Sequence, residues 1–150
     1  MSAYYTKVIP TDPYFLPEDD RLQKTADYLL DVLWAMEVKV NVTEAPVFID
    51  CGGYLEDIRC PLCGASLEFD WWTPLMDQRF VNGGFPDLEI AALPCCGGKS
   101  SLDRLDYLAP CGFARAEIRL LYPRRQPDQA CLAQAETLLG TPIQVIYSRI

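Results

Sequence analysis

The sequence contains no histidine, and this absence excludes several kinds of functional site. Its 150 residues include 13 Lys plus Arg, 21 Asp plus Glu and no His. One chain without histidine cannot form a Ser–His–Asp triad or a Cys–His nucleophile pair. It also lacks the side chain that titrates near neutral pH and that most often binds transition metals. A metal ion in this protein must therefore be bound by other side chains.

Basic charge is also scarce, which argues against nucleic acid as a partner. The net charge is −8, whereas nucleic-acid binding needs a basic face. The acidity is uneven, because residues 1–98 carry 16 acidic and 6 basic side chains and residues 99–150 carry 5 and 7. We therefore expect no nucleic-acid partner, and an acidic surface that would attract a basic protein.

Long apolar runs are missing too. The longest apolar patches are short, such as residues 90–94, whereas a membrane-spanning helix needs about 20 apolar residues. Residues 1–15 lack the basic and apolar regions of a signal peptide. The sequence therefore predicts a cytoplasmic protein without a membrane partner. In that reducing compartment, seven cysteines favour metal ligands and buried thiols, and a secreted protein stapled by disulfides is the alternative.

The residue patterns that are present predict a strand, a helix and a strand near each end of the chain. Apolar residues at three- and four-residue spacing indicate helices after residue 18 and after Pro127. Alternating or β-branched residues indicate strands over residues 3–9, 38–43, 113–122 and 143–150, with a further short extended piece at 47–49. Two such β-α-β units predict an α+β fold, a ferredoxin-like split β-α-β sandwich with both helices on one sheet face. We assign this domain to residues 1–50 and 102–150, and an inserted zinc-ribbon-like subdomain to residues 51–101.

Two short cysteine motifs in this insert predict a metal site. Cys-Pro-Leu-Cys-Gly occupies residues 60–64, and Pro-Cys-Cys-Gly-Gly occupies residues 94–98. In the first motif, both sulfurs fall on one side of a tight turn, and the amides that follow can donate to the thiolates. Gly64 can adopt the left-handed conformation that closes this turn. Because two such elements clamp a tetrahedral Zn²⁺, the predicted ligands are Cys60, Cys63, Cys95 and Cys96.

The adjacent cysteines leave alternatives open. Cys95 and Cys96 lack the usual spacing of two residues between ligands, so binding one ion through both sulfurs requires a local adjustment of the backbone. Cys111 is the reserve fourth ligand, and Cys51 is a further one. Cys131 lies on the apolar face of a predicted helix, so we expect it to be a buried core thiol.

Four sulfur ligands would close the coordination shell of zinc. A catalytic zinc keeps one position open for water and needs a nearby base. We therefore expect a structural zinc that folds the insert, which is too small to hold its own core. Beside the site, residues 66–70 could pair with residues 88–93 as a ribbon, and residues 73–80 could form a short helix. The carboxylates nearest in sequence, Glu68, Asp70 and Asp77, have positions typical of solvated charges.

The combination of these motifs is similar to that of a known family. The two cysteine motifs occur together with Ser-Leu-x-x-Leu-x-Tyr at residues 101–107, Gly-Phe-Ala-Arg at 112–115 and Leu-Gly-x-Pro-Ile at 139–143. Over roughly its C-terminal two-thirds, the chain resembles an uncharacterised family of small bacterial proteins with a zinc-ribbon-like insert. This resemblance implies a metal site and a bacterial cytoplasmic setting, and it implies no reaction.

The closed metal site, the missing catalytic residues and the acidity together predict a non-enzymatic, zinc-containing protein-binding module. One concrete form is an acidic inhibitor of the immunity type, which neutralises a basic toxin. Trp71 and Trp72 are the predicted partner-binding residues, because aromatic side chains are enriched at binding hot spots. In the alternative, one of these tryptophans covers the metal site and packs against Phe69 or Phe80.

Three other interpretations stay open on the sequence alone. A small metal-dependent or carboxylate-based enzyme of unknown substrate would use Asp50, Glu56 and Asp57, with Arg59 close by. A zinc ribbon that binds nucleic acid is opposed by the acidity of the insert. The acidic surface could also serve only to keep the protein soluble. The oligomeric state is open, and the outer face of the sheet is expected to be polar and solvated, with Lys39, Asn41, Arg115, Glu117 and Arg119.

Overall fold

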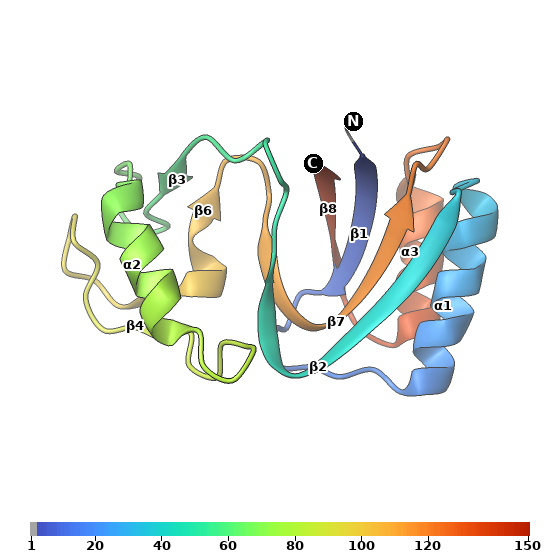
Figure 1. Cartoon of the computed structure of the whole chain (residues 1–150), viewed down its shortest axis with the longest axis horizontal. Coiled ribbons are helices and arrows are strands. Elements are labelled where there is room, and N and C mark those ends of the chain that lie inside the picture. Colours follow the sequence, from blue (N-terminus) through green and yellow to red (C-terminus); the bar gives the residue numbers. More distant parts are fainter. Residues whose placement is uncertain (1–2) are drawn as a thin grey trace.

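The chain folds as an α+β protein in which a twisted sheet lies between two helices and a smaller unit (Figure 1). A computed structural model describes residues 3–150. Within this range, four antiparallel strands form the main sheet in the order β2-β7-β1-β8. The strands are β1 (Tyr4–Pro10), β2 (Glu37–Ile49), β7 (Gly112–Leu121) and β8 (Ile143–Arg149). The two helices beside the sheet are α1 (Asp19–Val32) and α3 (Gln129–Leu139).

The helices and one face of the sheet enclose an apolar core, which we call the helix-side core. The alternation of β7 places Ala116, Ile118 and Leu120 in this core, as the sequence predicts. Ile118 lies opposite Val8 on one neighbouring strand and Val40 on the other. The core consists of Val8, Leu22, Ala26, Leu29, Leu33, Ala116, Ile118, Leu120, Cys131, Ala135 and Leu139.

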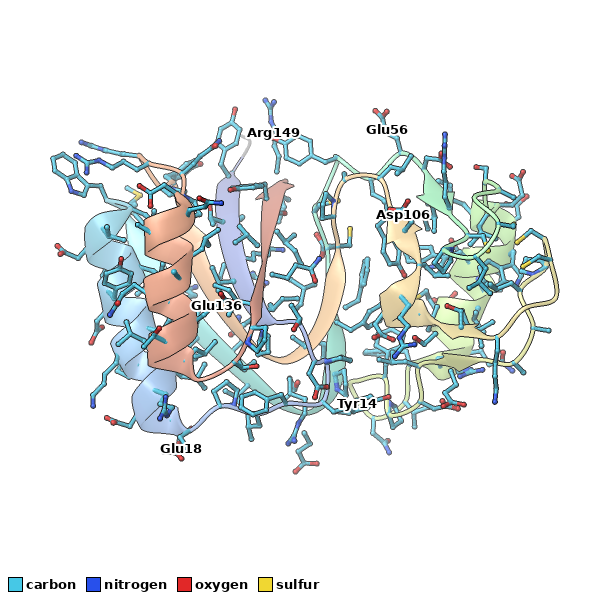
Figure 2. The ribbon with its side chains drawn as sticks, turned by 180° about the vertical axis from the view of Figure 1, so that it is seen from behind. Tyr14, Glu18, Glu56, Asp106, Glu136 and Arg149 are labelled. Carbon is cyan, nitrogen blue, oxygen red and sulfur yellow. The ribbon has the colours of Figure 1, made fainter. Side chains whose placement is uncertain are left out.

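The two helices differ in how they begin. Glu18 precedes α1 in an extended conformation and makes no side-chain cap bond, whereas Asp128 accepts a hydrogen bond from the Cys131 amide at 2.8 Å. Gly140, at φ 79°, ends α3 in the left-handed conformation that glycine adopts without strain. Glu18 and Glu136 mark the two helices in Figure 2. In the described range 3–150, no helix has both the length and the apolar character of a membrane span.

Strand β2 is longer than expected. The predicted pieces 38–43 and 47–49 belong to a single strand of 13 residues. Its pairing with β7 shifts between Val42 and Val47, because extra residues bulge out of the ladder there. A bulge bends its strand, so the last residues of β2 reach the smaller unit, as Figure 1 shows.

The smaller unit contains short elements joined by turns. They are β3 (Ile58–Arg59), α2 (Phe69–Arg79), β4 (Glu89–Ile90), β5 (Ser100–Ser101), a 3-10 helix (Leu102–Arg104) and β6 (Asp106–Tyr107). Strand β3 pairs with β6, and β4 pairs with β5. The predicted ribbon between residues 66–70 and 88–93 is wrong, because Ser66 bridges to Arg59 and helix α2 already begins at Phe69.

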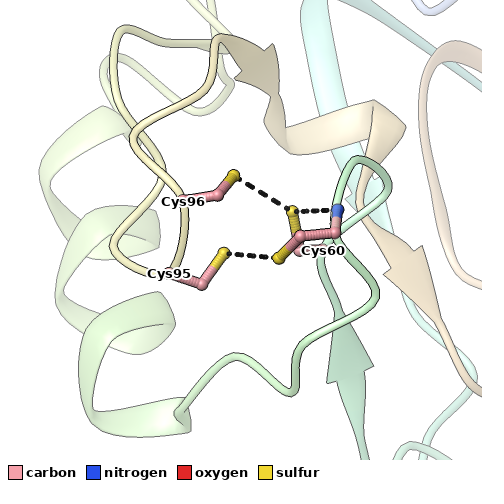
Figure 3. Close-up of side chains that lie close together, drawn as sticks. Cys60, Cys95 and Cys96 are labelled. Carbon is pink, nitrogen blue, oxygen red and sulfur yellow. Dashed lines mark hydrogen bonds between the residues drawn. The ribbon is translucent and has the colours of Figure 1, made fainter.

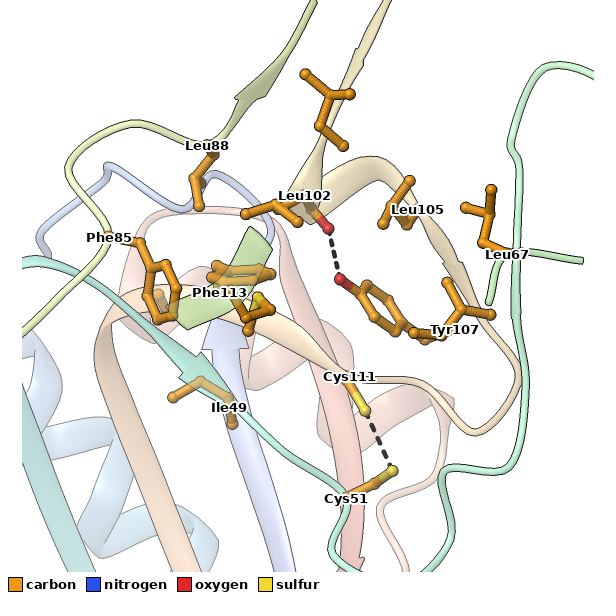
Figure 4. Packing of buried hydrophobic residues seen from close by; sticks show 14 of the residues in the cluster. Ile49, Cys51, Leu67, Phe85, Leu88, Leu102, Leu105, Tyr107, Cys111 and Phe113 are labelled. Carbon is orange, nitrogen blue, oxygen red and sulfur yellow. Dashed lines mark hydrogen bonds between the residues drawn. The ribbon is translucent and has the colours of Figure 1, made fainter. Parts of the chain in front are cut away.

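A second core joins the smaller unit to the main sheet (Figure 4). This insert-side core combines Ile9, Ile49, Phe113, Ala114 and Ile146 of the main sheet with buried residues that follow residue 50. The latter are Cys51, Ile58, Cys60, Leu67, Met76, Phe85, Leu88, Ile90, Leu93, Leu102, Leu105, Tyr107 and Cys111. The insert therefore does not depend on a metal ion alone for its packing, in contrast to the expectation that it is too small for a core.

The helix-free face of the main sheet is less solvated than its polar residues suggest. Lys7 is 1% exposed and Glu117 is 4% exposed. Lys7 Nζ donates to the Asp50 carbonyl at 2.9 Å, and the Glu117 carboxylate accepts from Asn41 at 3.0 Å and from Arg119 at 3.2 Å. These hydrogen bonds offset the cost of burying the charges. The prediction of a solvated outer face is therefore wrong at Glu117.

Candidate metal centre

Four cysteines from two loops bring their sulfur atoms together (Figure 3). Cys60 and Cys63 lie in the loop after β3, and Cys95 and Cys96 lie in the loop between β4 and β5. All four Sγ atoms lie within 4.8 Å of one another. The separation is 3.5 Å between the sulfurs of Cys63 and Cys95, and 3.9 Å between those of Cys60 and Cys96. The fold thus gathers the four cysteines that the two motifs point to.

The two loops form turns with the same backbone hydrogen bonds. In each turn, the amide of the first residue donates to the carbonyl five positions later, and the fifth amide donates back to the first carbonyl. The first residue is Cys60 in one turn and Leu93 in the other. Cys63 and Cys96 therefore share the fourth position, whereas Cys95 occupies the third. The first turn supplies a sulfur from its first residue, Cys60, but Leu93 at the same position of the second turn has no sulfur. Cys95, at the third position, supplies it instead.

Glycines allow both turns to close and to approach each other. Gly64 has φ 77°, as the motif predicts, and Gly97 has φ 71° at the equivalent position. A Cβ atom on Gly98 would lie 2.5 Å from Leu62 Cδ1 and 3.4 Å from Cys96 Sγ. The absence of a side chain at Gly98 therefore lets the first turn lie against the second.

Backbone amides stabilise the thiolate of Cys60. The amides of Leu62 and Cys63 donate to Cys60 Sγ at 3.3 Å and 3.4 Å. Burial opposes ionisation of this thiol, but the two amides together with hydrogen bonds from the Cys95 and Cys63 thiols outweigh burial and lower the pKa of Cys60 to about 6. Burial, followed by hydrogen bonds to the neighbouring thiols, raises the pKa of Cys95 to about 12. A metal ion would therefore meet one thiolate already formed at pH 7 and displace the proton of Cys95.

The spacing of the sulfurs suits a tetrahedral ion. With metal–sulfur bonds of about 2.3 Å, the sulfurs of a tetrahedral site lie about 3.8 Å apart. The separations of 3.5 Å and 3.9 Å lie on either side of that value. In the part of the chain that the structure describes, this is the one group of three or more Cys, Asp or Glu side chains close enough to share an ion. The cluster could therefore hold a metal ion through sulfur alone.

The reserve cysteines lie outside this cluster. Cys111 Sγ lies 3.1 Å from Cys51 Sγ, where the main sheet meets the insert (Figure 4). Cys131 is buried in the helix-side core, as predicted. The arrangement therefore favours Cys95 and Cys96 together over an exchange of either for Cys111.

The two tryptophans predicted to bind a partner lie on α2 and are half-buried. Trp72 Nε1 donates to the Tyr107 hydroxyl at 3.2 Å, and the Trp72 ring meets Phe48 and Phe69 edge-on. The contact with Phe69 agrees with the packing predicted in the alternative, whereas the cover that one tryptophan would give the metal site stays a prediction. Trp71 also packs against the insert-side core. A role of either residue in binding stays a prediction.

The carboxylates considered for acid–base chemistry are engaged elsewhere. Asp57 accepts hydrogen bonds from Ser66 Oγ at 2.6 Å and Arg59 Nε at 3.1 Å, and these bonds lower the pKa of Asp57. Asp50 Oδ1 accepts an amide hydrogen bond within its own turn at 2.9 Å. Glu56 is exposed and points away from the fold (Figure 2). Asp57 and Asp50 are thus engaged in local hydrogen bonds, and Glu56 faces solvent.

Comparisons with known proteins add little to this geometry. No family model matches the chain, and no curated protein matches it. A solved structure described as the Csm1–Csm4 cassette in complex with pppApApA is similar at 12% identity and a TM-score of 0.29, over 100% of this chain and 71% of that chain. A score this low does not indicate a shared fold, so this likeness supports no statement about function.

Proposed function

We propose that the four-cysteine cluster binds one zinc ion with a structural role. Zinc favours tetrahedral thiolate coordination, and the sulfur separations of 3.5 Å and 3.9 Å support this choice of ion. Four sulfurs fill the coordination shell, so no position is left for a reactive water molecule. The ion would connect the loop after β3 to the loop between β4 and β5.

Metal analysis of the purified full-length chain tests this proposal. We expect one zinc per chain, lost in the Cys60→Ser, Cys95→Ser and Cys96→Ser variants. Cys111→Ser and Cys131→Ser are matched controls, because these cysteines lie outside the cluster, and they should keep the zinc. A full zinc equivalent in Cys95→Ser or Cys96→Ser would contradict the ligand set.

We further propose that the protein is a non-enzymatic protein-binding module of the bacterial cytoplasm. The observation that carries this proposal is the exposed acidic face of α2. Asp70 and Asp77 are both exposed and lie seven residues apart, so they share one side of the helix. Phe69 and Phe80, at its two ends, are 38% and 53% exposed. Aromatic side chains beside a charged stripe are typical of binding surfaces.

The chemistry of this face supports a basic partner. Residues 51–101 carry seven acidic and three basic side chains. One of the basic side chains, Arg79, is already paired with Asp87 at 3.2 Å. An acidic face accelerates encounter with a basic protein, and salt weakens that effect. An acidic inhibitor that neutralises a basic protein is the form of this module that we propose.

Charge reversal tests the binding surface. Immobilised full-length chain, with mass-spectrometric identification of what it retains, supplies candidate partners for binding measurements with purified proteins. We expect a basic protein whose association rate falls with salt, and whose affinity falls at least about tenfold in Asp70→Lys/Asp77→Lys. Asp19→Lys/Asp31→Lys, on α1, makes the same change of charge and should leave the affinity unchanged. Equal losses of affinity in both variants would mean that only the net charge of the protein matters. The α2 face would then be rejected as the binding surface.

The tryptophans need a separate test, because both contact the insert-side core. Trp71→Ala should weaken binding of the identified partner while the zinc content stays near that of the wild type, and the loss of its packing on the core should lower the unfolding midpoint somewhat. Trp72→Ala removes the hydrogen bond to Tyr107 and should lower the midpoint as well. If the partner binds both variants with the affinity of the wild type, the two tryptophans are not a binding hot spot.

For the fold, we propose a ferredoxin-like main domain with a zinc-ribbon-like insert. The strand order β2-β7-β1-β8, with both helices on one face, supports the first part. The two cysteine turns and the short antiparallel pairs β3–β6 and β4–β5 support the second. An experimental structure with its metal content determined is the direct test.

A further inference from the structure

A second pair of thiols lies at the neck of the insert, which we define as residues 50–54 and 109–111. Here the chain leaves the main sheet after β2 and returns to it before β7. The ladder between these strands ends with Ile49 opposite Gly112. Cys51 and Cys111 lie just beyond that pair, and their Sγ atoms are 3.1 Å apart (Figure 4). Both cysteines are buried, at 1% and 4% exposure.

Contacts with β8 hold the two cysteines in place. The Arg149 amide donates to the Cys51 carbonyl at 3.4 Å, and Gln144 Nε2 donates to the Cys111 carbonyl at 3.3 Å. The carbonyl oxygen of Ala109 lies 3.6 Å from Cys51 Sγ and 3.4 Å from Cys111 Sγ. Ala109 has φ 112°, a conformation that non-glycine residues rarely adopt unless their surroundings enforce it. The thiols therefore meet in a fixed setting.

We propose that Cys51 and Cys111 form an intramolecular disulfide when the protein is exposed to a small-molecule disulfide such as oxidised glutathione. A disulfide needs a sulfur–sulfur distance of about 2.0 Å, so the two sulfurs must approach by only about 1 Å. The metal cluster has its own four sulfurs and takes no part in this reaction.

The reaction is a thiol–disulfide exchange in two steps. One cysteine thiolate attacks the small disulfide, breaks its S–S bond and releases one small thiol. The other cysteine then attacks the mixed disulfide, forms the Cys51–Cys111 bond and releases the second small thiol. The chain loses two protons and two electrons, which together equal two hydrogen atoms, and the small disulfide takes them up as it is reduced to two thiols.

Burial makes this exchange slow, and the resulting bond would resist reduction. Burial raises the pKa of the Cys111 thiol, so little thiolate exists at neutral pH. The oxidant must therefore reach the pair through local opening of the neck. Once formed, the bond ties the exit from β2 to the entry into β7 and closes the insert whether or not the cysteine cluster holds zinc.

Trypsin mapping tests the proposal sharply, because it separates the relevant cysteines. Cleavage after Lys and Arg places Cys51 in peptide 40–59 and Cys111 in peptide 105–115. The cluster cysteines fall in peptides 60–79 and 80–99. Full-length, zinc-supplemented protein is incubated in glutathione buffers of increasing oxidation, and its free thiols are then blocked before digestion. A parallel sample is refolded from urea in the same buffers, which removes any barrier due to burial.

We expect peptide 40–59 to be linked to peptide 105–115, with a mass loss of about 2 Da in the intact chain. The linked peptide should persist in Cys131→Ser, whose cysteine is buried in the other core, and should vanish in Cys51→Ser and in Cys111→Ala. The oxidised chain should also unfold at a higher urea concentration than the reduced chain. Two outcomes would overturn the proposal: free Cys51 and Cys111 after refolding in oxidised glutathione, or links from either residue to peptides 60–79 or 80–99.

Discussion

At the scale of the residue, two turns with matching backbones present their sulfurs from different positions. The six residues 60–65 read Cys-Pro-Leu-Cys-Gly-Ala, and residues 93–98 read Leu-Pro-Cys-Cys-Gly-Gly. The first position is buried in both turns, at 2% exposure for Cys60 and 2% for Leu93. In the second turn the buried first position is therefore filled by the apolar side chain of Leu93. Cys95, at the third position, supplies the sulfur. In the sequence, the match between the two turns is indicated by proline at the second position and glycine at the fifth position of each.

The low pKa of Cys60 predicts how zinc binding depends on pH. Zinc displaces protons from thiols, so its affinity falls as the pH falls. The pKa of Cys60 is lowered to about 6, so well above pH 6 zinc has no proton to displace from this residue. Below pH 6 zinc must displace one further proton, that of the Cys60 thiol. We therefore expect the plot of log affinity against pH to steepen by about one proton below pH 6. Competition with a chromophoric chelator from pH 8 to pH 5 measures the slope, and an unchanged slope through pH 6 would contradict the role of the Cys60 amides.

Two glycines with similar positive φ angles differ in how much room they leave for a side chain, and this difference gives a prediction about stability. Gly52 has φ 63° and Gly83 has φ 83°. A Cβ atom on Gly52 would lie 2.1 Å from the Arg149 carbonyl oxygen, whereas a Cβ atom on Gly83 would meet nothing within 4 Å. Gly83→Ala should cost about 1 kcal/mol for the left-handed conformation alone, and Gly52→Ala should cost clearly more. Urea denaturation measures both, and equal losses would show that the neck does not pack tightly against β8.

At the scale of the element, short segments depended on their surroundings more than long ones did. The alternation over residues 113–122 and the helical spacing after residue 18 each contain enough residues to define a face, so β7 and α1 agree with prediction. Residues 66–70 are too few to distinguish a strand from a helix start. Phe69 to Met76 form a helix because one side of α2 packs its tryptophans, Leu75 and Met76 on the insert-side core.

Helix caps supply a prediction at this scale. The Asp128 carboxylate accepts the Cys131 amide at 2.8 Å at the start of α3, whereas Glu18 makes no side-chain cap bond at the start of α1. Asp128→Ala should therefore lower the free energy of unfolding by about 1 kcal/mol, and Glu18→Ala should change it little. Thermal or urea unfolding of the two variants compares them directly. A larger loss in Glu18→Ala than in Asp128→Ala would contradict the assignment of the cap.

At the scale of the whole molecule, two cores share one sheet. Ile118 and Leu120 of β7 belong to the helix-side core, and Phe113 and Ala114 of the same strand belong to the insert-side core. The bulge in β2 bends the paired strands between these regions. The insert is therefore packed on the sheet through an apolar core that the two units share.

This arrangement predicts a graded response to removal of the metal. A strong chelator should lower the unfolding midpoint and expose the cysteines of the cluster to a thiol reagent. The far-UV circular dichroism should change little, because α1, α3 and the main sheet keep their own core. Cys60→Ser serves as the control, since its midpoint should not respond to the chelator. Complete loss of secondary structure on chelation would mean that zinc, and not the shared core, holds the fold together.

Local sequence patterns predict the strands of the main sheet, the two helices beside it and the four clustered cysteines. Periodicity and short-range motifs are local properties, and they are read along the chain without knowledge of distant contacts. Tertiary structure alone decided the burial of Lys7 and Glu117, the helical start at Phe69 and the meeting of Cys51 with Cys111. Each of these depends on residues far apart in sequence, such as the 60 positions that separate the two neck cysteines. Strand pairing in the sheet brings Asn41 to Glu117, and the return of the chain from the insert brings Cys111 to Cys51.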